Sequence, residues 1–364
     1  IGLAAALSGD GLSVQTFKKG PDYIDSMWLS RATDKPCRNL DYYTMSREEI
    51  LATFSRFSHG SDISLIEGNK GLYDGLNLDG SNSNAALATL VGAPVILVID
   101  ARGMTRGIAP LILGYQAFDP ALNIAGIILN KVGGPRHEGK LRDIIEHFTD
   151  IPVLGAVHKD ERFEIAERHL GLMPSNEAPE ADAKIETIAS LVASQVDLDA
   201  VRAIANTTIN LSAPALPHRN PSYANITIGV ARDCAFGFYY PGDLEALEDA
   251  GARLINIDMT REPQLPEIDG LFIGGGFPET RMAELEANHS MRQSIRLAID
   301  GGLPAYAECG GLMYLARSLT WNGETSDMVG VIPGDIIMHD KPQGRGYVKL
   351  AETGNGPWPL IGAG

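Results

Sequence analysis

Short apolar runs alternate with helical patterns along the first part of the chain, and this alternation constrains the fold more than any other feature. The runs are predicted strands, at 63–66, 94–100, 124–132 and 152–157. The stretches between them have the spacing of amphipathic helices, at 46–57, 82–91, 105–118 and 137–148. The run 95–99 is apolar at every position, which is typical of a strand buried on both faces of a parallel sheet. The pattern predicts α/β layers with right-handed crossovers.

A second alternation follows a proline-rich stretch. The segment 182–205 has the pattern of one helix, and the residues after it mix prolines with Ser, Thr and Asn, as linkers do. Strand and helix patterns then resume, at 226–231, 242–250, 252–257, 268–274, 288–300 and 304–308. We therefore predict an α/β domain over 1–205, a linker over 206–225 and a second α/β domain over 226–364.

Length and composition agree with two globular domains. The chain has 364 residues, 44% of them hydrophobic and 21% charged, and one domain takes about 100–200 residues. No run approaches the about 18 apolar residues of a membrane span. The net charge of −16 argues against nucleic acid or an anionic membrane as a partner, but not against a small anionic ligand. Three widely spaced cysteines argue against a disulfide scaffold and favour a cytoplasmic location.

Cys309 stands between a strand pattern and a helix pattern, in the segment Pro-Ala-Tyr-Ala-Glu-Cys-Gly-Gly-Leu-Met-Tyr-Leu. Gly310 permits a tight turn, and the start of the following helix favours a thiolate and offers N–H groups to an oxyanion. A glycine-rich turn ending at Gly276 can supply the second donor. We predict that Cys309 is a nucleophile and that Gly276 and Gly310 form an oxyanion hole. Cys37 and Cys234 lack such surroundings and are interpreted as structural.

Carboxylates follow two predicted strands of the first domain. The acids are Asp22, Asp25, Glu67 and Asp74, and two lysines, Lys18 and Lys19, precede the first pair. Because α/β sheets bind ligands at the carboxyl ends of their strands, these side chains are expected at one site. Lysines beside carboxylates suit a nucleotide phosphate with Mg²⁺.

The residues around Cys309 resemble a class I glutamine amidotransferase domain. The motifs GGGFPE (274–279) and AECGGLMYL (307–315) have the form found in the cobyrinic acid a,c-diamide synthase and cobyric acid synthase group. The resemblance implies that Cys309 attacks the side-chain amide of glutamine and that a His of a C-terminal HEFHYS-type motif is its base. This chain has no such motif, and His339 is interpreted as a surface-loop residue.

The acidic stretches resemble the synthetase domain of the same family, through KKGPDYID (18–25), PCRNLD (36–41) and EGNKGLYDG (67–75). The resemblance implies functional acids at Asp22, Asp25, Glu67 and Asp74, with Glu67 and Asp22 as Mg²⁺ ligands. It implies nucleotide binding by Lys18, Lys19, Asn130 and Lys131. It implies substrate binding by Tyr23, Ile24, Tyr73 and Arg38.

This synthetase domain is similar to dethiobiotin synthetase, which has a P-loop fold. The motif GxxxxGK[ST] is absent here, and residues 1–7 look like the helix that follows such a loop. The chain starts at Ile1 without Met and stops at Gly364 in a stretch rich in Gly and Pro. We therefore expect a fragment cut at both ends, with the P-loop and the catalytic His outside it.

The implied activity is an ATP- and glutamine-dependent amidation. ATP with Mg²⁺ would phosphorylate a carboxylate, and ammonia released at Cys309 would displace phosphate from the acyl phosphate. The implied substrate is a tetrapyrrole, with the a and c acetate side chains of cobyrinic acid as targets. Two alternatives stay open, a siroheme or sirohydrochlorin-type amidase and a non-catalytic relative that binds a tetrapyrrole or a nucleotide. Neither nucleic acid nor a membrane is expected as a partner, and a homodimer is left open.

Overall fold

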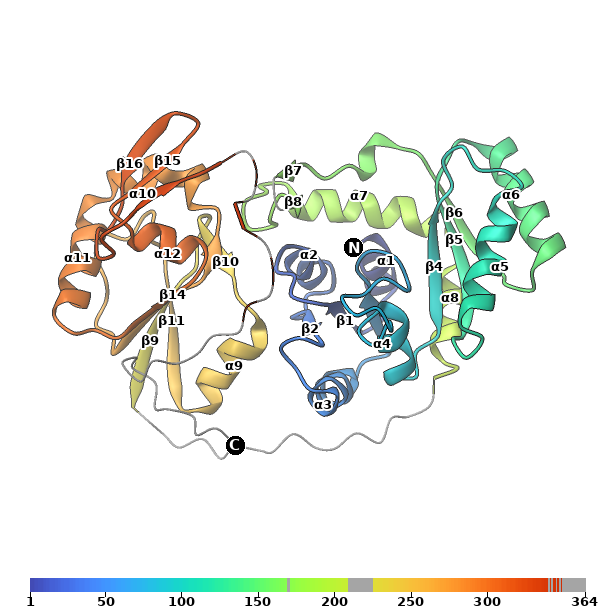
Figure 1. The fold of residues 1–364 in the computed structure, drawn as a ribbon, viewed down its shortest axis with the longest axis horizontal. Coiled ribbons are helices and arrows are strands. Elements are labelled where there is room, and N and C mark those ends of the chain that lie inside the picture. The colour runs from blue at the N-terminus through green and yellow to red at the C-terminus, as the bar shows by residue number, and fades with distance from the viewer. Residues whose placement is uncertain are drawn as a thin grey trace.

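The protein has two α/β halves that lie side by side in the computed structural model (Figure 1). The structure describes residues 1–168, 171–208 and 225–339, together with positions 341, 343, 344, 346 and 348. The N-terminal half is defined here as residues 1–208 and the C-terminal half as residues 225–339. None of the described helices is long and apolar enough to span a bilayer.

Two three-stranded parallel sheets form the N-terminal half. One has the order β2 (Arg38–Leu40), β1 (Val14–Lys19), β3 (Ile63–Glu67), and the other has the order β4 (Val95–Asp100), β5 (Ile124–Val132), β6 (Val153–His158). The predicted strands are confirmed within one or two residues. An apolar cluster that contains Ile63 of β3 and Ile128 of β5 joins the two sheets in one core.

The helices of this half cover the sheets and mostly match the predicted ranges. They are α1 (Gly2–Gly9), α2 (Ile24–Thr33), α3 (Arg47–Ser58), α4 (Asn84–Leu90), α5 (Ile108–Phe118) and α6 (Pro135–Phe148). Ser46 starts α3 with a capping box, because its hydroxyl accepts from the Glu49 N–H while the Glu49 carboxylate accepts from the Ser46 N–H. Helix α2 was not among the predicted elements.

Strand β4 corrects the expectation of burial on both faces. Val98 is 59% exposed, and Val95 and Ile96 are only half-buried. The reason is that β4 is an edge strand of its sheet in the part of the chain that the structure describes. An apolar run therefore did not mean complete burial.

The single helix predicted over 182–205 is wrong. Two helices occupy this region, α7 (Ala181–Ala193) and α8 (Leu198–Ala205), after a short antiparallel pair of β7 (Glu167–Arg168) and β8 (Gly171–Leu172). Between the helices the chain hydrogen-bonds to β6, since the Gln195 carbonyl accepts from the Ala156 N–H at 3.1 Å. Asp197 then caps α8 by accepting from the Ala200 N–H. Helical periodicity cannot reveal such a tertiary contact.

A four-stranded parallel sheet forms the centre of the C-terminal half. Its order is β11 (Ala252–Ile257), β9 (Ile226–Ala231), β12 (Gly270–Ile273), β14 (Ala305–Ala307). The helices are α9 (Pro241–Asp249), α10 (Met282–Ala287), α11 (His289–Asp300) and α12 (Gly310–Leu315), with a 3₁₀ turn over Pro278–Arg281. These elements confirm the second predicted alternation. Most of the predicted linker, residues 209–224, lies outside the described residues, so the domain boundaries remain a proposal.

Two smaller β structures complete this half. The antiparallel pair of β10 (Phe236–Phe238) and β13 (Gly275–Gly276) lies beside Cys309. A separate sheet has the order β16 (Glu324–Asp327), β15 (Ser318–Trp321), β17 (Asp335–Ile337). Neither was predicted, because each strand is only two to four residues long.

The two halves share an apolar cluster. Ile24 and Trp28 of α2 pack in it with Phe238 and Phe277 of the C-terminal half. Polar contacts surround the cluster, among them the Asn176 amide, which donates to the Asp233 carbonyl at 2.9 Å. Burial of apolar surface and matched hydrogen bonds therefore fix how the halves meet.

Two buried carboxylates lie on either side of this interface. Glu177 of the N-terminal half pairs with Arg168 at 2.6 Å and accepts from the Thr280 hydroxyl at 3.4 Å. Glu279 of the C-terminal half is only 2% exposed. Burial raises the pKa of Glu279 to about 7, and the charge of Glu177 adds to the shift. Ionising Glu279 near neutral pH therefore opposes folding.

We expect Glu279→Gln to change how stability depends on pH. A folded pKa above the ordinary value of 4.5 means that this group favours folding at low pH and loses that contribution as pH rises through about 7. The shift corresponds to about 3 kcal/mol at most. The free energy of unfolding in urea should fall less between pH 5.5 and pH 8 in the variant than in the wild type. The exposed Glu324→Gln serves as control, and equal pH slopes in all three proteins would contradict the prediction.

Candidate functional site

Cys309 lies on a sharp turn between β14 and α12, as predicted. Its backbone has φ 48° and ψ −116°, a conformation that residues other than glycine rarely adopt. Such strain is typical of functional positions. The residue is exposed, whereas Cys37 is fully buried and Cys234 is half-buried.

The turn needs glycine because backbone segments approach one another closely. A Cβ on Gly310 would lie 2.9 Å from the Gly276 carbonyl oxygen, and one on Gly311 would lie 2.2 Å from the Ile273 carbonyl oxygen. At Gly276, where φ is +158°, a Cβ would lie 1.9 Å from the Ala235 carbonyl oxygen. The glycines of both motifs therefore bring the two turns together.

The electrostatics of Cys309 correct the expectation of a favoured thiolate. Although part of the residue is open to solvent, the surrounding protein partly desolvates the thiol, and this desolvation is the largest effect and raises its pKa. Backbone hydrogen bonds from Gly310 and Gly276 lower it, while the charges of Glu308 and Glu279 raise it further. The net shift is upward, because desolvation and the two nearby carboxylates outweigh these hydrogen bonds. Both backbone donors nevertheless lie next to the sulfur, and the oxyanion hole that they are expected to form stays a prediction.

Asp233 organises the strand behind this turn and was missed by sequence reasoning. One carboxylate oxygen accepts from the N–H groups of Ala235 and Phe236, and the other accepts from that of Met259. Phe236 pairs with Gly276, so Asp233 supports the predicted oxyanion hole. Burial raises the pKa of Asp233 to about 6, against the lowering effect of those hydrogen bonds. The available signal was a pair of charged residues, Arg232 and Asp233, directly after an apolar strand.

The acidic motifs meet around the buried ammonium group of Lys18. Its Nζ lies 2.6 Å from Asp25 Oδ2 and 2.7 Å from Glu67 Oε1. Parallel pairing places Lys18 directly opposite Glu67, and Asp25 lies in the first turn of α2. Burial lowers the pKa of Lys18, but the two carboxylates outweigh it and raise the pKa overall. Lys18 is therefore a permanent cation between two acids.

Asp22 and Lys19 flank this cluster. Asp22 Oδ1 accepts from the Asp25 N–H at 2.9 Å, and burial followed by the Asp25 charge raises its pKa. Lys19 Nζ donates to Asn69 Oδ1 at 3.3 Å, and burial lowers its pKa. The backbone nitrogen of Ile1 lies 3.8 Å from Glu67 Oε2, so the first turn of α1 faces the same cluster.

Several predicted residues lie away from Lys18. Asp74 is exposed and accepts from the Gly71 N–H within its own loop. The Tyr73 hydroxyl donates to the Tyr115 carbonyl at 2.6 Å. The side chain of Ile24 is buried in the apolar cluster between the halves. None of these contacts joins the Lys18 cluster.

Two further predicted groups have partners elsewhere. Arg38 is buried and pairs with Glu245 of α9 at 2.5 Å, with its guanidinium 3.8 Å from the centre of the Phe57 ring. Its Nε and Nη1 have no hydrogen-bond partner among the described residues. Asn130 and Lys131 lie near the end of β5, where Asn130 Oδ1 accepts from the Lys131 N–H and Lys131 Nζ lies 3.9 Å from Asp100.

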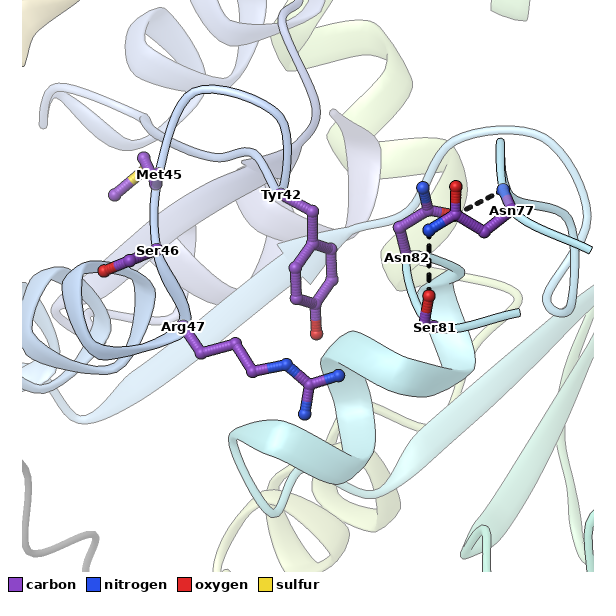
Figure 2. Close-up of a pocket in the computed structure, with 7 residues that line it drawn as sticks. All are labelled: Tyr42, Met45, Ser46, Arg47, Asn77, Ser81 and Asn82. Atoms are coloured by element: carbon purple, nitrogen blue, oxygen red, sulfur yellow. Dashed lines mark hydrogen bonds between the residues drawn. The ribbon is translucent and has the colours of Figure 1, made fainter. Parts of the chain in front are cut away.

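A small polar pocket opens at the edge where β2 and β3 end. It has a volume of about 310 Å³, and its walls are Tyr42, Met45, Ser46, Arg47, Asn77, Ser81 and Asn82. In Figure 2 the hydroxyl of Tyr42 points toward the guanidinium of Arg47, and Asn77, Ser81 and Asn82 lie on the other side of the pocket. The Tyr42 hydroxyl is buried without a hydrogen-bond partner among the described residues. Sequence reasoning did not find this pocket.

No group of three or more His, Cys, Asp or Glu side chains converges on a metal position within the described ranges. Lys18 Nζ instead occupies the point where Asp25 and Glu67 meet. The second oxygen of Glu67, Oε2, does not take part in the ion pair with Lys18. In nucleotide sites Mg²⁺ usually binds one or two carboxylates together with phosphate oxygens. The residues present therefore fit Mg²⁺ only as part of a metal–nucleotide complex.

Gly276→Ala should disrupt the turn behind Cys309. The added Cβ overlaps the Ala235 carbonyl, so we expect a loss of about 2 kcal/mol in stability and, for the glutamine hydrolysis that the motifs imply, about a hundredfold loss through the displaced N–H. Gly242→Ala is the matched control, because it lies in α9 of the same half and its Cβ would meet nothing within 4 Å. Thermal unfolding and glutamate release measure the two effects. Equal behaviour of the two variants would be evidence against this role of Gly276.

Known proteins share both sets of motifs. The family of CobB/CobQ-like glutamine amidotransferase domains matches residues 227–357, and that of AAA domains matches residues 32–165. The cobyrinate a,c-diamide synthase of Magnetococcus marinus is 47% identical over 99% of this chain and 79% of its own length. The cobyrinate a,c-diamide synthase of Methanosarcina acetivorans is 41% identical over 93% of this chain and 73% of its own length. The one of Listeria monocytogenes is 40% identical over 95% of this chain and 77% of its own length.

These matches extend over both halves of the molecule and confirm the resemblance drawn from the motifs. They also confirm the order of a nucleotide-binding α/β domain followed by an amidotransferase domain. Identity of 39–47% over most of the chain is far above the level at which only the fold is shared. The chain belongs to the cobyrinate a,c-diamide synthase family of glutamine-dependent ligases.

Proposed function

We propose that the protein amidates acetate side chains of a tetrapyrrole, with ATP and glutamine as co-substrates and the a and c carboxylates of cobyrinate as targets. The observation that carries the proposal is the presence of two reactive groupings on one chain. One is Cys309 with the Gly276 and Gly310 N–H groups at its sulfur, and the other is the Lys18 cluster. The names of the relatives supply the substrate class.

In the glutamine half-reaction, Cys309 Sγ attacks the side-chain carbonyl carbon of glutamine. The Gly276 and Gly310 N–H groups stabilise the negative charge that develops on the carbonyl oxygen. Because the thiol pKa is raised, a base must take the thiol proton, which then reaches the leaving nitrogen as ammonia departs. Water hydrolyses the remaining thioester and releases glutamate.

In the synthetase half-reaction, a substrate carboxylate oxygen attacks the γ-phosphorus of ATP, giving an acyl phosphate and ADP. Ammonia then attacks the acyl carbon, and phosphate leaves. Lys18, whose charge Asp25 and Glu67 already balance, would hold these carboxylates beside the phosphates, and the first turn of α1 would hold phosphate through its N–H groups. Lys19, Asn130 and Lys131 are proposed as further nucleotide contacts.

Mg²⁺ would be held by Glu67 and Asp22 together with phosphate oxygens. When bound, it supplies positive charge against the transferring phosphoryl group. Asp25 keeps Lys18 in place through their 2.6 Å contact, and Asp22 stabilises the start of α2 by accepting from the Asp25 N–H. Asp74 is proposed to act through the loop that it closes onto Gly71.

The polar pocket of Figure 2 supports an anionic substrate. Arg47 offers a guanidinium, and the Asn77 and Asn82 amides offer donors at the same edge of the sheet. We propose that it receives a peripheral carboxylate of the tetrapyrrole. The proposed substrate-binding residues are still Tyr23, Ile24, Tyr73 and Arg38. The role of Arg38 is supported by two buried guanidinium nitrogens that have no hydrogen-bond partner among the described residues.

Mass-spectrometric counting of amides added to candidate tetrapyrroles tests the substrate. Two amides on cobyrinate would support the proposal. Amidation confined to siroheme or sirohydrochlorins would favour the other branch of the family. No amide on any acceptor, with the full-length protein, ATP and either nitrogen source, would indicate the non-catalytic relative.

Cys309→Ser should separate the two half-reactions. Glutamine-driven amidation should fall by about a thousandfold or more, because the nucleophile is lost. Amidation driven by high ammonia should persist, since it bypasses Cys309. Amide formation is measured with each nitrogen source, and Cys234→Ser serves as control. Loss of both activities in the Cys309 variant would contradict separate sites.

Glu67→Gln should reduce amidation with glutamine and with ammonia alike, by about a hundredfold. The substitution removes one carboxylate from Lys18 and the proposed Mg²⁺ ligand. The exposed Glu48→Gln is the control, and thermal unfolding shows whether the buried Lys18 tolerates the loss. Retained turnover in a folded Glu67 variant would exclude Glu67 from the reaction.

A further inference from the structure

A single side chain connects the acidic motif with the loop that carries Cys309. Tyr23 lies between Asp22 and Asp25 in sequence and starts α2. Its ring stacks on those of Tyr240 and Phe238 in the C-terminal half, with centroid distances of 4.2 and 5.5 Å. Its hydroxyl donates to Glu308 Oε1 at 3.4 Å. Glu308, the residue next to Cys309, therefore contacts Tyr23 of the acidic motif, and Asp25 of the same motif pairs with Lys18.

Glu308 is tied to the turn by its backbone as well. Its N–H donates to the Ile273 carbonyl at 3.1 Å, and its carbonyl accepts from the Gly311 N–H at 2.8 Å. Its second carboxylate oxygen accepts from the Tyr306 hydroxyl at 3.1 Å. These hydrogen bonds fix Glu308 directly beside the strained backbone of Cys309.

The surroundings keep the tyrosines as hydrogen-bond donors. Burial raises the pKa of Tyr23 strongly, with Tyr240 and Glu308 adding to the shift. Burial also raises the pKa of Tyr240 to about 12 and that of the nearby Asp243 carboxyl. The charge of Glu308 contributes to the pKa of Cys309 as well. The carboxylate of Glu308 thus acts on the thiol on one side and on Tyr23 on the other.

Building on the proposed function, we propose that Tyr23 and Glu308 are positioning residues that couple glutamine hydrolysis at Cys309 to carboxylate activation at the Lys18 cluster. The aromatic stack holds Tyr23 in place. The 3.4 Å hydrogen bond is longer than the usual O–H···O distance of about 2.7–2.8 Å. It therefore shortens or breaks at little cost when either site is filled, as a communicating contact must.

The test compares Glu308→Gln, Tyr23→Phe, their double variant and the control Tyr306→Phe. The control removes a hydroxyl from the same Glu308 carboxylate, but within one half of the molecule. Two ratios are measured in the full-length protein with cobyrinate as acceptor. They are glutamate released per amide formed, and glutamine-driven relative to ammonia-driven amidation.

We expect glutamate per amide to rise about fivefold or more in Glu308→Gln and in Tyr23→Phe, with the second ratio falling to match. The double variant should be no worse than either single one, because both remove the same contact. Tyr306→Phe should stay close to the wild type. Unchanged ratios, additive effects, or an equal effect of Tyr306→Phe would overturn the coupling role. A wild-type protein that forms no amide even with ammonia would instead refute the proposed function.

Discussion

The buried ammonium group of Lys18 is the interaction on which the N-terminal site depends. Parallel pairing of β1 with β3 places Lys18 opposite Glu67, and the first turn of α2 brings Asp25 to the same nitrogen. A buried lysine is tolerated only with such partners, because its desolvation is costly. The carboxylates in turn avoid mutual repulsion through the cation. The pairing of β1 with β3, the start of α2 and the charge balance at Lys18 therefore depend on one another. Helix α1 begins beside this cluster.

Backbone proximity plays the corresponding role in the C-terminal half. Glycines allow the turn after β12 to approach the turn before α12, and Asp233 holds β10 behind them. The result is a strained cysteine with two N–H groups at its sulfur and a pKa above its usual value. The contact of Tyr23 with Glu308 is proposed to link this site to the Lys18 cluster.

Sequence patterns predicted the fold well where an element is long and its periodicity is strong. Strands β3 to β6 and helix α11 appear within one or two residues of their predicted ranges. The failures have specific causes. The helix over 182–205 is interrupted where Gln195 hydrogen-bonds to β6, and β4 is partly exposed because it is an edge strand. The motifs located the Cys309 turn and the Lys18 cluster, because their residues follow the ends of strands. Asp233 and the pocket beside Arg47 were missed, because neither belongs to a motif.

The sequence alone determined the α/β class, the elbow at Cys309 and the family, because glycine spacing and strand-end acids are local properties that the chain displays directly. Only the tertiary structure decided which acids act together. It placed Asp25 and Glu67 on Lys18, left Asp74 in its own loop and turned Arg38 toward Glu245. It also decided that Tyr23 meets Glu308, although 285 positions separate them. Such contacts depend on how the two halves pack, and no periodicity or local propensity records the packing of distant surfaces.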